Sequence, residues 1–376
     1  MNKNNLWKWF VGMVILAILA IIFVGIQSKE NKSSDLKIGV IATLTGPGAY
    51  FGEGFVSGLQ MAVKDINDSG GIRGNRVSLI VEDSGTDNSK ALSAAKKLVE
   101  VDGVSVILGD SWNSTTLTIM PYTNSKKVIM ISPVASLDSL SQDDYLFRIV
   151  PKTENFMKAL SEYIGGQGIK SVAFARASGP FGEEHYQDFK KEFEKLGGVI
   201  VSDEQFDPKA LDVRTELTKI KENKPSAIFD LHSSGPSVGL LIAQGNQLGI
   251  KTQYITTWSA ENDALLKQYG KDIEGIIYPF MYNESDSTTT KQFTEEVRKE
   301  GKNNDYFIAS GYDTLGIVTK AMNDSGYFAG DPLKKALLNI KDYDGKSGIF
   351  SFDQNGDVNR KIYIKTVKNG EFQTVH

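Results

Sequence analysis

Few residues of this chain could carry covalent or metal chemistry. The sequence has no cysteine, so thiol catalysis, disulfides and cysteine-based zinc sites are excluded. It also has only three histidines, which do not cluster: His185, His232 and His376. The search for a serine nucleophile elbow finds only 233–235, which lacks the first glycine of that motif. We therefore expect a protein that is not an enzyme and that needs no cofactor.

One acidic segment has the spacing of a calcium loop. Asp353, Asn355 and Asp357 follow the start of an EF-hand, but the sixth position is Val358 and the twelfth is Ile364. An EF-hand needs glycine and glutamate there. The Asn-Gly pair in this segment is instead typical of a tight turn between strands. We predict no metal site.

Polar and aromatic side chains gather in loops that follow apolar runs. Tyr50 and Phe51 come after a glycine-rich turn and could form the wall of an apolar site. A dinucleotide loop is not expected there, because its last glycine is replaced by Phe51. Residues 109–116 include Trp112, Asn113 and Ser114 at the start of an expected helix, where free N–H groups and hydroxyls could hold a carboxylate. Simple N-capping by Asn113 or Ser114 is an alternative, and Trp112 could stack on a ligand or merely pack.

The elements that position these loops alternate regularly. Short apolar runs at 36–44, 77–81, 104–108 and 128–131 predict buried parallel strands, and amphipathic helices separate them. The alternation resumes after Pro151, with strands expected at 171–176, 199–202, 226–231, 252–256 and 276–278. Such alternation predicts two α/β units built from right-handed βαβ repeats. Ligands of these sheets bind outside the carboxyl ends of the strands.

The last quarter of the chain is different. Three consecutive helices are expected near 288–300, 306–324 and 332–341, followed by a β pair made of 348–352 and 361–367. Because helices alone do not extend a sheet, they are expected to return to the first unit. The predicted division is a first lobe of residues 36–150 and 281–348, and a second lobe of residues 151–280 and 349–376.

The N-terminus carries a membrane signal. Lys3 and Lys8 precede a run from Trp9 to Ser28 without any charge, which is long enough to cross a bilayer as a helix. The lysines orient the body of the chain outside the cytoplasm. No small-x-small cleavage site is evident, which favours a retained anchor over a cleaved signal peptide. Residues 1–35 are therefore expected to be an anchor and tether, and the absence of cysteine excludes a lipoprotein anchor.

The charge pattern excludes one class of partner. The chain has 42 basic and 46 acidic residues, a formal net charge of −4, and no basic cluster. A nucleic-acid partner is not expected.

Several segments together resemble a known family. The chain resembles the type I periplasmic binding proteins, in particular the branched-chain amino acid (leucine/isoleucine/valine) group, which are receptor components of ABC importers. The resemblance covers about 36–370. It rests on residues 38–40, 45–47 and 70–74, with Gly52, Gly58, Ala62 and weaker echoes such as Phe181-Gly182 and Tyr312-Asp313. It implies two Rossmann-like lobes joined by three crossovers, with the ligand in the cleft between them.

The resemblance also implies site residues. Asn113 and Ser114 match the family's serine cluster, and Val134 and Ser136 occupy positions that hold the ligand's amino and carboxylate groups. In the second lobe, the residues that match contact positions are Phe181, which replaces a tyrosine, and Ser233 or Ser234. Trp258 falls where amino-acid binders carry the carboxylate that pairs with the ligand ammonium. A buried ammonium needs such a partner, and only Glu261, Asp110 and Asp230 could substitute.

The expected function is capture of a small molecule, an amino acid, amide or related carboxylate or aromatic compound, by hinge closure. The partner would be the membrane permease of an ABC importer. The alternative is a ligand-sensing receptor module on the same fold that signals through a membrane partner.

Overall fold

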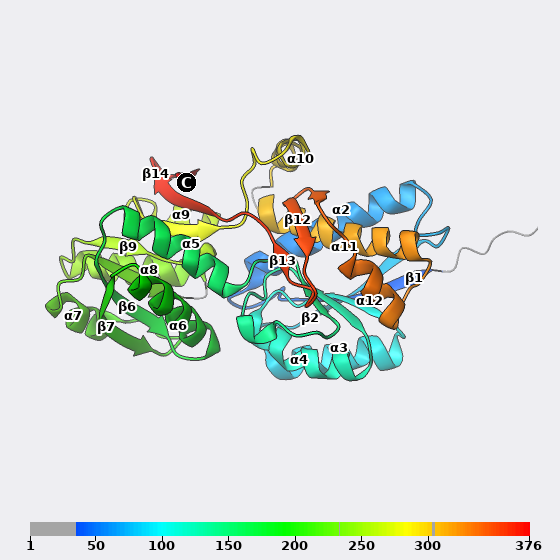
Figure 1. The fold of residues 1–376 in the computed structure, drawn as a ribbon, viewed down its shortest axis with the longest axis horizontal. Coiled ribbons are helices and arrows are strands. Elements are labelled where there is room, and N and C mark those ends of the chain that lie inside the picture. The colour runs from blue at the N-terminus through cyan, green and yellow to red at the C-terminus, as the bar shows by residue number, and fades with distance from the viewer. Residues whose placement is uncertain (1–34, 233, 303–304) are drawn as a thin grey trace, which may run out of the picture.

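The computed structural model describes residues 35–232, 234–302 and 305–376. They form two α/β units that lie side by side along the long axis of the molecule (Figure 1). The chain enters the second unit after the fifth strand, returns to the first after the tenth, and crosses once more near its end. This architecture confirms the predicted fold class.

The first unit is built on a five-stranded parallel sheet in the order β2-β1-β3-β4-β5. Helices α2, α11 and α12 cover one face, and α3 and α4 cover the other. The central strands are apolar runs because both of their faces are buried. The strands are β1 (Leu36–Ala42), β2 (Val77–Asp83), β3 (Val106–Gly109), β4 (Ile129–Ser132) and β5 (Leu146–Arg148). The helices are α2 (Ala49–Asp68), α3 (Asn88–Lys96) with its π-helical extension η1 (Lys97–Val101), α4 (Asn113–Ser125), the short η2 (Asp138–Leu140), α10 (Thr288–Lys299), α11 (Asp305–Ser325) and α12 (Gly330–Leu338).

The second unit contains a seven-stranded sheet in the order β15-β14-β10-β9-β8-β6-β7. Strands β6 to β10 are parallel, and β14 and β15 add an antiparallel edge. The strands are β6 (Ser171–Ala177), β7 (Val199–Phe206), β8 (Ala227–Leu231), β9 (Gln253–Ile255), β10 (Ile277–Phe280), β14 (Tyr363–Lys368) and β15 (Glu371–Thr374). The helices are α5 (Thr153–Gly166), α6 (Pro180–Lys195), α7 (Arg214–Glu222), α8 (Gly235–Gln247), the short η3 (Trp258–Ala260) and α9 (Asp263–Tyr269).

The C-terminal strands pair differently from the prediction. Residues 348–352 and 361–367 were expected to pair with each other, but β12 (Gly348–Phe352) pairs with β11 (Tyr343–Gly345) and β13 (Val358–Asn359). Strand β14 pairs instead with β10 and β15 of the second unit. The predicted turn at 353–357 therefore closes a small separate sheet.

Residues 349–359 are held on the first unit. Phe352 packs edge-on against Phe147 with ring centroids 5.2 Å apart. Arg148 Nε donates to Asp357 Oδ1 at 2.7 Å, and both side chains are almost fully buried. These contacts correct the predicted lobe boundary at residue 349, because the chain crosses to the second unit only after residue 359.

Two glycines let helices α2 and α11 approach closely. A Cβ on Gly58 would lie 1.8 Å from the carbonyl oxygen of Ile308, and one on Gly311 would lie 2.1 Å from a backbone carbonyl of α2. No other residue fits at this contact. The close approach brings Phe307, near the start of α11, against Phe51 of α2, with ring centroids 4.9 Å apart.

The predicted membrane anchor lies outside the described residues, as does the rest of residues 1–34. In the part of the chain that is described, no helix has both the length and the apolar character needed to cross a bilayer. The anchor remains a prediction.

Candidate ligand-binding site

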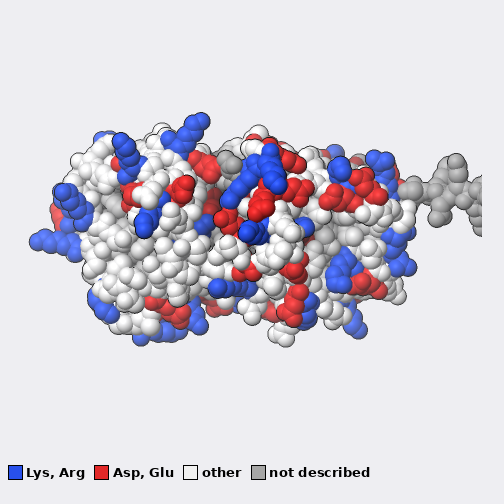
Figure 2. Space-filling view, turned by 90° about the horizontal axis from the view of Figure 1, so that it is seen from above, with Lys and Arg blue, Asp and Glu red and all other residues white. Residues whose placement is uncertain are grey.

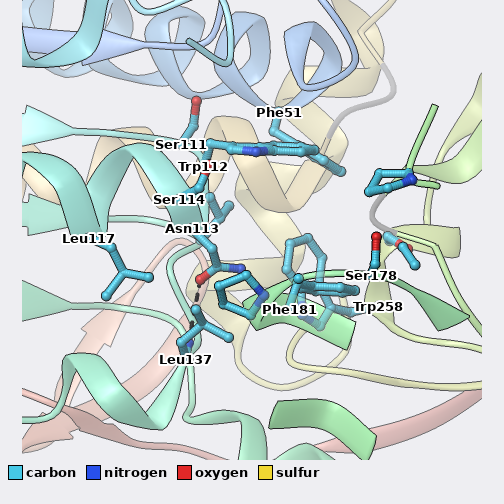
Figure 3. Close-up of a pocket in the computed structure, with 16 residues that line it drawn as sticks. Phe51, Ser111, Trp112, Asn113, Ser114, Leu117, Leu137, Ser178, Phe181 and Trp258 are labelled. Carbon is cyan, nitrogen blue, oxygen red and sulfur yellow. Dashed lines mark hydrogen bonds between the residues drawn. The ribbon is translucent and has the colours of Figure 1, made fainter. Parts of the chain in front are cut away.

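A cavity of about 250 Å³ lies between the two units, which we call the first cavity (Figure 3). Residues at the carboxyl ends of strands line it from both sides, as the fold predicts. The first unit contributes Phe51, residues 111–114, Leu117, Val134 and Leu137, and the second unit contributes residues 177–181, Pro208, Trp258 and Ser259.

Aromatic rings form much of the wall of the first cavity. Phe51 is central: its ring stacks near Trp112 at 6.3 Å and meets Trp258 edge-on at 5.5 Å. Phe181, on the first turn of α6, lies toward the same space in Figure 3. Trp258 is only 4% exposed, and its indole Nε1 has no hydrogen-bond partner among the described residues. A buried donor without a partner costs free energy, and this nitrogen is itself shielded from the open space of the cavity.

Two helix N-termini open at the first cavity. Helix α4 starts at Asn113 because Trp112, the N-cap residue, has an extended backbone, and no side chain caps the helix. Helix α6 follows Gly179, whose φ of 111° favours glycine, and it also lacks a capping side chain. Uncapped first-turn N–H groups and the helix dipole favour an anion.

The alternative of capping by Asn113 or Ser114 is wrong, because Trp112 occupies the N-cap position. The Asn113 side chain instead accepts a hydrogen bond through Oδ1 from the backbone N–H of Leu137 at 3.4 Å (Figure 3). Its amide group is thereby held at the cavity wall, with the NH₂ end left to donate.

No ionisable side chain is among the sixteen residues that line the first cavity. The three substitutes considered for the missing carboxylate lie elsewhere. Asp110 is fully buried behind the loop, where Thr43 Oγ1 donates to it at 3.3 Å, and burial raises its pKa to about 6. Asp230 accepts from His232 Nδ1 at 2.6 Å. Glu261 is bound to Lys365 and to the hydroxyl of Tyr278. The cavity is therefore neutral.

The structure brings together seven of the eleven predicted site residues. These seven line the first cavity: Phe51, Trp112, Asn113, Ser114, Val134, Phe181 and Trp258. Their contact with a ligand remains a prediction.

The other predicted residues lie elsewhere. Tyr50 lines a different cavity on the opposite side of Phe51. Ser136 is fully buried and accepts from Thr153 Oγ1 at 3.3 Å, because its loop turns inward to meet α5. Ser234 is the N-cap residue of α8, with its Oγ 2.9 Å from that of Ser237. Ser233 lies outside the described residues.

Sequence reasoning missed part of the wall. Ser178 and Pro208 follow the ends of β6 and β7, so the strand-end rule alone could have found them. Leu137 and Ser259 carried no such signal. Ser259 enters through the turn of η3, where its Oγ donates to the carbonyl of His232 at 3.2 Å.

The comparisons with known proteins agree with this geometry. Residues 35–371 match the sequence model of a periplasmic binding protein family. A leucine-, isoleucine-, valine-, threonine- and alanine-binding protein of Pseudomonas aeruginosa is 23% identical over 353 residues, covering 90% of this chain and 91% of that protein. Among solved structures, a leucine-binding protein of Thermotoga maritima superposes with a TM-score of 0.85 at 24% identity, covering 91% of this chain and 98% of that one. A solute-binding protein of an ABC transporter from Rhodopseudomonas palustris, in complex with 3,4-dihydroxybenzoic acid, gives 0.82 at 24% identity, covering 91% and 96%.

The two α/β units with a cavity between them define a solute-binding protein of the ABC-transporter type. The chain belongs to the periplasmic binding protein family, and its resemblance to the branched-chain amino acid group is confirmed. Its relatives from Pseudomonas aeruginosa and Escherichia coli are named for the binding of leucine, isoleucine and valine.

Proposed function

We propose that this protein captures a small aromatic or apolar carboxylate in the first cavity and delivers it to the permease of an ABC importer. The observation that carries the proposal is the cavity itself, a neutral space walled by aromatic rings at two uncapped helix N-termini. Its volume of about 250 Å³ suits a small solute.

The charge of the cavity argues for a carboxylate without an amino group. A buried ammonium needs a compensating carboxylate, and the wall offers none. An anion, by contrast, can take hydrogen bonds from the first turns of α4 and α6 and from the amide of Asn113. The resemblance places the carboxylate of amino-acid binders at position 258, where Trp258 supplies no negative charge. The benzoate-type ligand of the R. palustris neighbour is in keeping with this class.

Binding would close the two units on each other. We propose that they act as lobes made of residues 36–150 with 281–359, and 151–280 with 360–376. Residues from both lobes line the first cavity, so a ligand gains its full set of contacts only when the lobes meet. We further propose that the apolar run at 9–28 tethers the protein on the outer side of the membrane, which cell fractionation of the intact chain would test.

The test is a thermal-shift and calorimetric comparison of benzoate, 4-hydroxybenzoate, benzamide and leucine with the purified protein. Benzoates should raise the melting temperature by mass action, and benzamide, which has no charge, should do so far less. Trp258→Ala removes a ring from the wall of the first cavity and should weaken benzoate binding several-fold. A shift with leucine alone, or no shift with any carboxylate, would contradict the proposal.

The sensing alternative uses the same cavity and differs in the partner. Reconstitution with an ABC permease distinguishes the two, because only a transport receptor stimulates ligand uptake.

A further inference from the structure

A second cavity, of about 850 Å³, lies on the other side of Phe51. The two cavities are separated by an aromatic partition in which Phe51, facing the first, packs on Phe307, facing the second, at 4.9 Å. Both units contribute to the second cavity, along with the crossover at 282–285. Figure 2 looks onto this side of the molecule and shows charged side chains gathered at its middle, between the two units.

The lining of the second cavity has an excess of negative charge. Its two basic side chains are already paired, Lys365 with Glu261 and Arg298 with both Glu284 and Asp305. Five carboxylates line the same space: Glu261, Asp263, Glu284, Asp305 and Glu371. Within the described part of the chain, neither Asp263 nor Glu371 has an ion-pair partner. Arg298 can compensate only one of its two carboxylates, so the lining carries three uncompensated negative charges in all.

Burial and neighbouring carboxylates raise the pKa values of two groups in the lining of the second cavity. The pKa of the Asp305 carboxyl is raised, chiefly by burial, although Arg298 opposes the shift. The pKa of the Tyr50 hydroxyl is raised by burial and then by Asp263 and Glu261. One buried oxygen of Asp305, Oδ1, has no hydrogen-bond partner among the described residues. That oxygen is too buried to meet a ligand, but a cation in this space would offset the negative charge that Asp263 and Glu261 place beside Tyr50.

Aromatic rings complete the lining, and two of them already hold a cation. The Nζ atom of Lys365 lies 5.0 Å from the ring centre of Phe280 and 5.9 Å from that of Phe372. Tyr50 and Phe307 add an edge-to-face pair at 5.9 Å. Rings together with surplus carboxylates are the surroundings that bind organic ammonium and guanidinium groups.

We propose that the second cavity binds an organic cation of the amine or guanidinium class, at a site separate from that of the solute in the first cavity. Its positive group would lie near Asp263 and Glu371, and its carbon chain against Tyr50 and Phe372. Because Tyr50 belongs to the first unit and the other three to the second, the cation contacts both units. Its binding would therefore bias how they close.

The test uses titration calorimetry of the intact chain with agmatine, a small molecule that carries an amine and a guanidinium group. Agmatine should bind, and Asp263→Asn combined with Glu371→Gln should weaken it at least tenfold. The matched control is Glu222→Gln, which removes an exposed carboxylate on α7, away from the cavity, and should leave the affinity unchanged. Circular dichroism checks that each variant folds. If the double variant does not fold, Phe372→Leu, which removes one ring from an edge strand, should weaken agmatine several-fold.

Three outcomes would overturn the inference. One is no measurable binding of agmatine by the folded protein. Another is an equal loss in the Glu222→Gln control, which would mean diffuse attraction to a negative surface. The third is displacement of agmatine by saturating 4-hydroxybenzoate, which would place the cation in the first cavity. Failure of benzoate binding alone leaves this inference standing, because the two titrations are independent.

Discussion

The two cavities that flank Phe51 differ in almost every respect except position. The first is small and neutral, and aromatic rings and helix N-termini form its wall. The second is larger, and seven ionisable side chains besides its tyrosines line it. Both lie between the same two units, so their position in the fold does not distinguish the ligands that we expect them to bind. The charge of the lining distinguishes these ligands, because desolvating an ion is costly wherever no partner is present.

The partition between the cavities offers the largest expected effect. Phe51 is 2% exposed and contacts Trp112, Trp258 and Phe307. Phe51→Ala would join the two spaces and should lower the free energy of unfolding by about 3–5 kcal/mol. Urea denaturation measures the change. Phe51→Leu serves as the control and should cost much less, and an equal cost in both variants would mean that the ring does not form the partition.

The next effect comes from making the first cavity resemble the second in charge. Trp258→Glu introduces a carboxylate into the neutral wall. We expect loss of 4-hydroxybenzoate binding by about a hundredfold or more, or about 2.7 kcal/mol, because two negative charges would then share a buried site. Leucine, whose ammonium gains a partner, should bind better than it does to the unaltered protein. Calorimetry with both ligands measures these changes in affinity. Unchanged selectivity would show that the charge of this wall does not determine which ligand binds.

The smallest effect concerns three carboxyl groups that meet across the units beside the first cavity. Glu184 of α6 accepts hydrogen bonds from the backbone N–H groups of Asp138 and Ser139, and oxygens of Asp138, Glu184 and Asp188 lie within 4.8 Å of one another. Burial raises the pKa of Asp138 to about 6 and that of Asp188 to about 7. The carboxylate of Glu154 adds to both shifts. The nearby ammonium groups, Lys152 for Asp138 and Lys191 for Asp188, oppose them.

The sign of the pH dependence follows from these raised pKa values. The contact between the units is fully stable below the ordinary aspartate pKa of 3.8, and its stability falls as the pH rises to about 7. The melting temperature should therefore be a few degrees higher at pH 5 than at pH 8. Asp188→Asn should reduce this difference, whereas Glu222→Gln should not. A pH profile that is the same in Asp188→Asn as in the unaltered protein would contradict the assignment.

Much of the fold followed from local patterns. The strands at 36–42 and 106–109 were predictable because short, mostly apolar runs that end before turn or loop residues have few alternatives to buried parallel strands. The C-terminal strands were not, because a strand such as 348–352 shows which of its faces is buried but not which sheet it joins. The buried pair of Arg148 and Asp357, 209 residues apart, settles that choice.

The candidate site likewise has features that the sequence predicted and features that only the tertiary structure determined. The sequence by itself determined the residue types at the strand ends, including a tryptophan at position 258, where the resemblance to amino-acid binders implies an acid. Tertiary structure alone decided that Tyr50 and Phe51, adjacent in sequence, face different cavities, because only the packing of the two units creates a cavity on each side of Phe51. It also decided that Asp110, Asp230 and Glu261 are all occupied elsewhere. The neutrality of the first cavity is a property of packing, because it depends on which charges are turned away from the space and not on which charges the chain contains.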